Sequence, residues 1–333
     1  MSPVSRLLFK VFPAAMFVVS AFSFPLKAQT RYAFTHRQMG TTFQVLLYAA
    51  DSVGAREAAD AAFRRIDTLN AILSDYRDDS ELNALCRTAG SGRWIRVSPD
   101  LWRVLRISHR AARQSNGAFD LTVGPVVRLW RRARRQHELP ADAALQEAKA
   151  RTGYAYVRYR PLRKAVRLQK PGMQLDPGGI GKGYAVDEAL KVLKQKGIES
   201  ALVDGGGNLA LGAPPPGKAG WQVQVGAMEG DTSHAETVTL HHVGVSTSGD
   251  RYQYVEIAGK RYSHIVDPAT GTGLVNQCTV SVIARNGTEA DWLSTAASVL
   301  GPVRGMRLMK KVPQASAYIL APSGSGFQRF SSL

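Results

Sequence analysis

The sequence predicts an α+β protein of two packed lobes, built from largely antiparallel sheet and helices. Helical periodicity is clear in three segments before residue 200, whereas short β-rich runs follow one another from Trp221 onward. A turn at Ala258-Gly-Lys260 joins two of these runs, which is typical of an antiparallel hairpin. No internal repeat or low-complexity segment breaks this order, so we expect a single domain over residues 29–333.

Three helices are expected in the first part of the chain. The first covers about Ser52 to Leu73 and follows a strand from Thr41 to Ala49. The second begins after the N-cap Ser98, with a proline at the first helical position. The third follows a glycine-rich loop and ends at Gly197, before a strand from Ser200 to Val203.

The second part of the chain is predicted to consist of short strands followed by two helices. The helices cover about Glu289 to Leu300 and Val303 to Lys311, and a last strand lies near Ala315 to Leu320. The expected strands before them are Trp221 to Val225, Thr237 to Leu240, Tyr252 to Ile257, Arg261 to Val266 and Thr279 to Ile283.

Residues 1–28 have the features of a secretory signal peptide. Arg6 and Lys10 precede an apolar run from Val11 to Leu26, and Ala28 provides a small residue for cleavage. The run is shorter than the roughly 20 residues that span a bilayer, so a permanent membrane helix is the weaker alternative. We therefore expect an exported, periplasmic protein whose mature chain begins near Gln29.

The chain is strongly basic, with a formal charge of +17. Removal of the three cations in residues 1–28 would leave 17 − 3 = +14, a charge that favours anionic ligands, nucleic acid or an acidic membrane surface. Export argues against nucleic acid. The densest cationic run, Arg128 to Arg135, is either a solvated helix face or a docking surface for the inner membrane or a partner.

Only two cysteines occur, Cys86 and Cys278. This number excludes a disulfide scaffold and a zinc cluster. The two residues are either paired or two separate thiols, because the sequence does not give their separation.

The segment from Leu175 to Asp187 places four glycines and Lys182 immediately before an amphipathic helix. Glycine lets the main chain approach a ligand, and the free N–H groups of a helix start attract phosphate. Gly183 stands where the common phosphate-binding signature has Ser or Thr, so the loop matches no standard nucleotide motif. A tight strand-to-helix connection without a ligand is the alternative.

Asp291 and Thr295 are four residues apart in a predicted helix and project from the same face. Both are oxygen ligands, and Mg²⁺ is commonly held by one or two carboxylates together with phosphate oxygens. An ordinary first-turn Asp and a helix-interior Thr are the alternative interpretation.

His264 lies in a predicted strand, where it is either a core side chain or a proton acceptor over a pocket. Turn chemistry explains the following Asp267 and Gly271 without any function. A second glycine turn, Asp204-Gly-Gly-Gly-Asn208, serves either close packing or approach to a planar ligand.

Together these motifs resemble the ApbE-type FAD:protein FMN transferases. The resemblance runs from Met39 to about Gly301 in the family's order. Pro177 stands where the family usually has Leu, and Ala269 replaces a commonly basic residue. The matching motifs are Met39-Gly-Thr41, Leu73 to Leu82, Gly117-Ala-Phe-Asp120, Leu175 to Asp187, Asp204 to Asn208, Ser248-Gly249, His264 to Gly271 and Ala290 to Thr295.

The resemblance implies an FAD cleft between the two lobes, with Mg²⁺ at the pyrophosphate. Asp176 and Lys182 would hold the nucleotide. Asp291, Thr295 and a main-chain oxygen near Gly179 would hold the metal. The residues implied in contact with the flavin or adenine parts are Met39, Tyr76, Ala118, Phe119, Asp120 and Ile265.

The implied reaction transfers FMN from FAD to a Thr or Ser hydroxyl of an acceptor protein and releases AMP. Lys182 would stabilise charge on the pyrophosphate, and His264, or alternatively Asp267, would accept the hydroxyl proton. The implied acceptors are FMN-carrying subunits of membrane redox complexes and exported flavoproteins. An FAD pyrophosphatase and an exported FAD-binding protein without catalysis are the alternatives.

Overall fold

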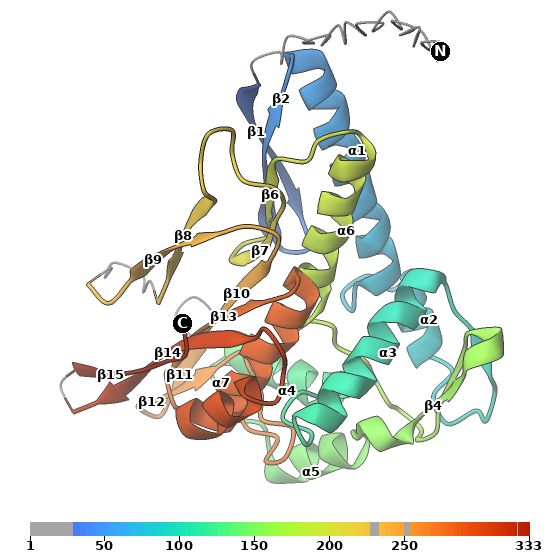
Figure 1. Cartoon of the computed structure of the whole chain (residues 1–333). Coiled ribbons are helices and arrows are strands. Elements are labelled where there is room, and N and C mark those ends of the chain that lie inside the picture. Colours follow the sequence, from blue (N-terminus) through green and yellow to red (C-terminus); the bar gives the residue numbers. More distant parts are fainter. Residues whose placement is uncertain (1–28, 227–232, 250–253, 325) are drawn as a thin grey trace, which may run out of the picture.

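The computed structural model describes residues 29–226, 233–249, 254–324 and 326–333. Its main feature is an eight-stranded sheet in which all neighbouring strands are antiparallel, in the order β1-β2-β6-β7-β10-β13-β14-β15 (Figure 1). The strands are β1 (Thr30–Gln38), β2 (Thr41–Ala49), β6 (Ala201–Asp204), β7 (Asn208–Leu211), β10 (Gly244–Ser248), β13 (Thr279–Ala284), β14 (Ser316–Ser323) and β15 (Gly326–Ser331).

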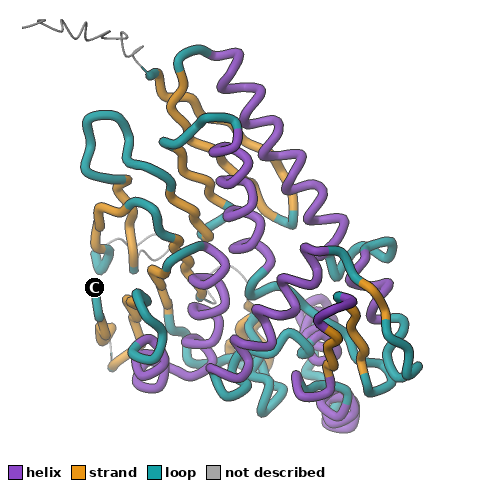
Figure 2. The backbone as a smooth tube through the Cα atoms, turned by 45° about the vertical axis from the view of Figure 1, so that its right-hand side comes forward, coloured by secondary structure: helices purple, strands orange, loops and turns teal. Residues whose placement is uncertain are grey.

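Three helices cover one face of this sheet, namely α1 (Ser52–Leu73), α6 (Gly181–Gln195) and α7 (Gly287–Met309) (Figure 2). The alternation of side chains along β2 explains how two cores form. Val45 and Leu47 face the helices and join the main core, whereas Leu46 and Tyr48 pack against a second cluster on the opposite face. That second cluster lies under a hairpin of β8 (Trp221–Val225) and β9 (Glu236–Leu240).

The remaining elements lie beyond one end of α1 and α6 (Figure 1). They include a three-stranded sheet, β3-β5-β4, and a hairpin of β11 and β12. Their bounds are α2 (Glu81–Cys86), β3 (Ile95–Arg96), α3 (Pro99–Gln114), α4 (Gly124–Gln136), α5 (Asp142–Ala150), β4 (Val157–Arg160), β5 (Ala165–Leu168), β11 (Tyr254–Ile257) and β12 (Lys260–Ser263). The predicted α+β class with largely antiparallel sheet is confirmed.

Several element predictions agree with the structure residue by residue. The bounds of β2, α1 and β8 are those expected, and the Ser98 side chain caps α3 by accepting a hydrogen bond from the N–H of Leu101. The two helices predicted after β13 are joined in α7 across a kink, where Gly301 has φ 72° and precedes Pro302.

The strand predicted from Arg261 to Val266, which contains His264, ends earlier than expected. β12 stops at Ser263, and His264 lies in an exposed bend after it. The cause is local, because the Ser263 hydroxyl accepts a hydrogen bond from the N–H of Ile265 and turns the chain out of the ladder.

Cys86 and Cys278 are two separate thiols, so the paired alternative is excluded. In the part of the chain that the structure describes, no helix has both the length and the apolar character needed to cross a membrane. The predicted signal peptide lies outside the described residues.

Candidate active site

The loop that precedes α6 is folded by its own hydrogen bonds. The N–H of Gly178 donates to Asp176 Oδ1 at 2.7 Å, and the N–H groups of Ile180 and Gly181 donate to the Pro177 carbonyl at 3.0 and 2.7 Å. Ile180 occupies the N-cap position and makes no side-chain hydrogen bond to the helix. The loop itself therefore supplies no side-chain cap for the positive end of α6, a helix end that attracts phosphate.

Two glycines bring the start of α6 against α7. A Cβ atom on Gly179 would lie 2.7 Å from Thr295 Oγ1, and one on Gly183 would lie 2.6 Å from Asp291 Cβ. Side chains at these positions would separate the two helices. The glycines of the loop thus allow its main chain to meet the two α7 residues that the sequence predicts as metal ligands.

Asp291 is buried at this contact, beside Lys182. Its Oδ2 atom accepts a hydrogen bond from the N–H of Gly183 at 2.9 Å. Burial raises the pKa of Asp291, and the positive charge of Lys182 opposes part of this rise. A second positive charge at the carboxylate would favour its ionised form in the same way.

The donor set at this contact suits a hard cation. It offers the Asp291 carboxylate and the Thr295 hydroxyl, with the main chain of Gly179 packed against Thr295, and Mg²⁺ prefers oxygen ligands. Among the described residues, no group of three or more His, Cys, Asp or Glu side chains is placed to hold a metal ion.

Arg131 of α4 connects Tyr76 with Asp176. Its guanidinium lies 4.2 Å from the centroid of the Tyr76 ring, donates to Asp176 Oδ2 at 2.7 Å, and forms an ion pair with Asp75. Tyr76 is 73 % exposed, so much of its ring is accessible to a flat ligand. The arginine thus positions an aromatic surface beside the glycine loop.

The predicted turn Ala118-Phe-Asp120 packs beside the same elements. The Phe119 ring contacts the Trp292 ring edge to face, with centroids 6.4 Å apart. The N–H of Asp176 donates to the carbonyl of Leu121 at 2.8 Å, which joins this turn to the glycine loop. The turn is therefore held between α7 and the loop.

Asp120 itself is occupied by local hydrogen bonds. Its carboxylate accepts from the N–H and the hydroxyl of Thr122, at 2.8 and 2.7 Å, and from the N–H of Tyr154 at 2.9 Å. Burial raises the pKa of this carboxyl group. Asp120 thus holds the turn together, and its contact with a nucleotide stays a prediction.

Met39 lies in the turn between β1 and β2, with a left-handed φ of 51°. The second glycine turn adjoins this one, because a Cβ atom on Gly206 would lie 2.3 Å from Thr41 Oγ1. Two motifs about 165 residues apart in the sequence therefore meet at one end of the sheet. Contact between Met39 and a flavin stays a prediction.

The segment from His264 to Gly271 is a loop attached to α4. The Trp130 indole donates to the Gly271 carbonyl at 2.8 Å, and Ile265 accepts a main-chain hydrogen bond across the loop. Asp267 Oδ1 accepts from the N–H of Ala269 at 2.8 Å, as turn chemistry predicts. Neighbouring residues of α4, Trp130 and Arg131, thus hold the His264 loop and the Tyr76 region, respectively.

A sequence profile described as the ApbE family matches residues 39–320. This span includes the glycine loop, the ligand pair on α7 and all the predicted site residues. The chain belongs to the ApbE family.

Curated relatives of this ApbE-family chain are similar over most of its length. A protein from Klebsiella pneumoniae (strain 342), named FAD:protein FMN transferase, is 31% identical over 312 residues, which are 92% of this chain and 88% of that protein. A protein of the same name from Treponema pallidum (strain Nichols) is 33% identical over 300 residues, which are 85% of this chain and 83% of that protein.

Solved ApbE structures have the same fold. The apo form of the flavinyl transferase ApbE from Pseudomonas stutzeri matches with a TM-score of 0.82 and 29% identity, covering 93% of this chain and 96% of that chain. The flavin transferase ApbE from Vibrio cholerae matches with a TM-score of 0.80 and 27% identity, covering 91% of this chain and 97% of that chain.

Sequence reasoning missed the role of Arg131 in this ApbE-family chain. The sequence predicts one charged surface from Arg128 to Arg135, but the Arg131 side chain is only 19% exposed and forms ion pairs with Asp75 and Asp176. The sequence contains a signal for this, because Arg131 and Arg134 follow the apolar Val127 at positions i+4 and i+7 and therefore share its helix face. The structure shows all three residues partly buried.

A buried hydroxyl cluster behind Asp291 was also missed. Ser294 donates to the Asp291 carbonyl at 2.9 Å, and its Oγ atom lies 2.9 Å from that of Ser246 and 2.7 Å from that of Ser248. These contacts bind α7 to β10. The Ser248-Gly249 motif of the ApbE family therefore supports the helix that carries the ligand pair.

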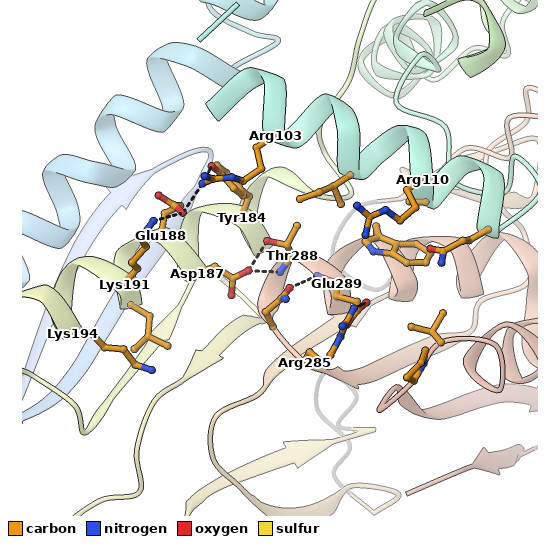
Figure 3. Close-up of a pocket in the computed structure, with 18 residues that line it drawn as sticks. Arg103, Arg110, Tyr184, Asp187, Glu188, Lys191, Lys194, Arg285, Thr288 and Glu289 are labelled. Atoms are coloured by element: carbon orange, nitrogen blue, oxygen red, sulfur yellow. Dashed lines mark hydrogen bonds and ion pairs between the residues drawn. The ribbon is translucent and has the colours of Figure 1, made fainter. Parts of the chain in front are cut away.

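A pocket of about 540 Å³ lies between α3, α6 and α7, apart from the predicted ligands (Figure 3). At its edge, Asp187 accepts hydrogen bonds from the N–H groups of Gly287 and Thr288 at 2.7 and 2.8 Å. Lys182, Asp291 and Thr295 do not line this pocket. Asp187 thus caps α7 from outside the candidate site.

Proposed function

We infer that this chain is an FAD:protein FMN transferase that uses Mg²⁺. The family membership and the relatives of that name support the reaction class. The single observation that carries the metal and nucleotide assignment is the contact of Gly179 with Thr295, next to the buried Asp291 and the positive charge of Lys182. A glycine loop suited to phosphate and an oxygen ligand pair are adjacent there.

In this proposal, Asp291, Thr295 and the carbonyl of Gly179 hold Mg²⁺, and Asp176 and Lys182 hold the nucleotide. The bound metal would neutralise charge that develops on the pyrophosphate. Lys182 adds a positive charge at the same phosphates, and the loop amides orient the phosphorus for attack. The exposed ring of Tyr76 offers a stacking surface for a flat heterocycle.

His264 is proposed as the base that takes the proton of the acceptor hydroxyl, with Asp267 as the alternative. His264 is exposed on its loop, which is compatible with access by another protein. Asp267 already accepts a turn hydrogen bond, which makes it less available for proton transfer. Met39, Ala118, Phe119, Asp120 and Ile265 complete the proposed flavin and adenine contacts.

The acceptors are proposed to be exported flavoproteins or FMN-carrying subunits of membrane redox complexes. This part of the proposal depends on residues 1–28, which have the composition of a secretory signal, and places the protein in the periplasm. Fusion of residues 1–40 to a reporter that is active only after export tests the location.

Incubation of the protein with FAD, Mg²⁺ and an acceptor domain tests the reaction. We expect equimolar AMP and a fluorescent flavin that stays on the denatured acceptor. Free FMN in place of labelled acceptor would indicate a pyrophosphatase, and unchanged FAD would indicate a binding protein without catalysis. Both outcomes would contradict the proposed function.

The variant Asp291→Asn tests the metal site separately. An asparagine oxygen can still accept the hydrogen bond from Gly183, so folding should persist while the affinity for Mg²⁺ falls. The readout is the rise in unfolding temperature with added Mg²⁺, which does not require activity. The exposed Asp142→Asn is the matched control and should retain the wild-type response.

A further inference from the structure

The three-stranded sheet presents one strongly basic face. Arg158 lies directly opposite Arg167 across β4 and β5, and Arg96 and Arg160 flank Ala165 in the next row. We call this surface, together with the turn after β4, the basic sheet face. Its cationic residues are Arg96, Arg158, Arg160, Arg163, Lys164 and Arg167.

These charges are not balanced by neighbouring acids. Residues 148–175 contain eight Lys or Arg and no Asp or Glu. In the described part of the chain, no carboxylate forms an ion pair with any of the six cations. Like charges directly opposite on a sheet destabilise it, so this arrangement is more costly to fold than a mixed surface.

An aromatic ring partly compensates for this cost. The guanidinium groups of Arg160 and Arg167 lie 4.2 and 4.7 Å from the Trp94 ring centroid. The Arg167 Nε atom is nevertheless buried without a hydrogen-bond partner. The face thus concentrates positive charge around an amphipathic ring and leaves one donor unsatisfied.

The turn after β4 adds an apolar tip. Leu162 is 103% exposed, which makes it the most exposed of the large hydrophobic residues in the described chain. Arg163 and Lys164 follow it directly, and Arg160 precedes the turn. Figure 1 shows β4 at the outer edge of the molecule, so this tip projects from the body of the protein.

We propose that the basic sheet face docks on an anionic lipid bilayer. The cations would contact the headgroups while Leu162 enters the acyl boundary and Trp94 lies at headgroup level. Arg and Lys side chains are long enough for their charged ends to stay among the headgroups while a neighbouring apolar residue enters the acyl boundary. A single apolar residue that projects alone among cations fits a bilayer better than an acidic protein, which would require a complementary hydrophobic pocket for it.

Co-sedimentation of the full chain with lipid vesicles tests this docking. One set of vesicles is zwitterionic phosphatidylcholine, and the other contains about one-third phosphatidylglycerol. We expect binding to the anionic vesicles that weakens with salt. The zwitterionic vesicles report any binding, including that of residues 1–28, that does not depend on lipid charge.

A triple variant removes charge from the face. Arg160→Gln, Arg163→Gln and Lys164→Gln together should weaken binding to the anionic vesicles by about a hundredfold, or roughly fivefold per charge. The control triple variant Arg304→Gln, Arg307→Gln and Lys310→Gln removes the same charge from exposed positions at the C-terminal end of α7, outside the basic sheet face. It should bind nearly as the wild type does.

Leu162→Ser tests insertion without changing the charge or the core. It should weaken binding to the anionic vesicles by roughly tenfold, with an unchanged unfolding temperature because the side chain is fully exposed. The proposal would be overturned if the wild-type protein did not bind the anionic vesicles, or if the two triple variants lost equal amounts of this binding. If the Leu162→Ser variant bound the anionic vesicles as strongly as the wild type, and the basic sheet face also bound polyglutamate, the proposal would be overturned in favour of an acidic protein partner.

Discussion

The guanidinium of Arg131 lies over the ring of Tyr76, 4.2 Å from the ring centroid, while it bridges the carboxylates of Asp75 and Asp176. One side chain thereby determines the position of an exposed aromatic ring and the charge balance of two buried acids. Without Arg131, Asp75 and Asp176 would repel each other in a site with little water, because burial and the charge of Asp176 both disfavour the ionised form of Asp75.

We expect Arg131→Gln to lower the free energy of unfolding by about 3 kcal/mol, because it leaves two buried carboxylates without their cation. FAD affinity should fall as well, since Tyr76 loses its support. Denaturant titration and flavin fluorescence measure the two effects. The control Arg132→Gln changes an exposed neighbour and should shift stability by less than about 0.5 kcal/mol; equal effects of the two variants would contradict the assigned role.

Gly179→Ala should destabilise the contact between the loop and α7. Its Cβ atom would lie 2.7 Å from Thr295 Oγ1, so the loop or the threonine must move, at a cost of about 1–3 kcal/mol. The expected consequence is a loss of Mg²⁺-dependent stabilisation in thermal unfolding.

Gly326→Ala provides the matched control, because its Cβ atom would meet nothing within 4 Å. A double-mutant cycle with Thr295→Ser locates the effect, since removal of Cγ2 relieves part of the crowding. Additive effects of Gly179→Ala and Thr295→Ser would show that the two residues are not in contact.

Asp187 should make the stability of the protein depend on pH. Burial raises the pKa of Asp187 to about 6 from 3.8. The folded protein therefore keeps a proton that the unfolded chain releases between about pH 4 and pH 6, and the free energy of unfolding falls as the pH rises through this window. The expected fall due to this group is about 3 kcal/mol.

Asp187→Asn removes this titration and keeps an oxygen that can accept a hydrogen bond from Gly287 or Thr288. The difference between the free energy of unfolding of the wild type and that of the Asp187→Asn variant should therefore decrease from pH 4 to pH 7. Denaturant titrations at several pH values provide the measurement. A difference that stays constant, or that increases with pH, would mean that the carboxylate is ionised throughout the range.

The Cys86 thiol should be inert in the folded protein. Burial raises its pKa to about 11, so the reactive thiolate is scarce at neutral pH. Iodoacetamide is expected to modify the native protein slowly, and a thiol assay in denaturant without reductant should find two free groups. Fewer than two would indicate a disulfide and contradict the separation of Cys86 and Cys278.

Much of the fold was predictable because its signals are local. The helix from Ser52 to Leu73 follows from the spacing of its apolar residues, and the α3 N-cap follows from the chemistry of Ser98. The end of β12 was not predictable from alternation alone. The hydrogen bond between Ser263 and Ile265 turns the chain at a point where the sequence pattern still favours a strand.

The glycine loop and the Asp291/Thr295 pair were also predictable, because both depend on residue types at short spacing. That Gly179 touches Thr295 required the packing of α6 on α7, which no short segment encodes. The hydroxyl cluster of Ser246, Ser248 and Ser294 likewise depends on the pairing of β10 with distant elements.

The sequence by itself determined the fold class, the main helices and strands, the family resemblance and the chemical types of the site residues, because periodicity and side-chain chemistry are carried by neighbouring residues. Only the tertiary structure decided that Arg131 turns inward from a basic run, that His264 lies beyond its strand, and that the cysteines stay apart. These outcomes depend on which surfaces of distant elements meet, and that is a property of the packed chain as a whole.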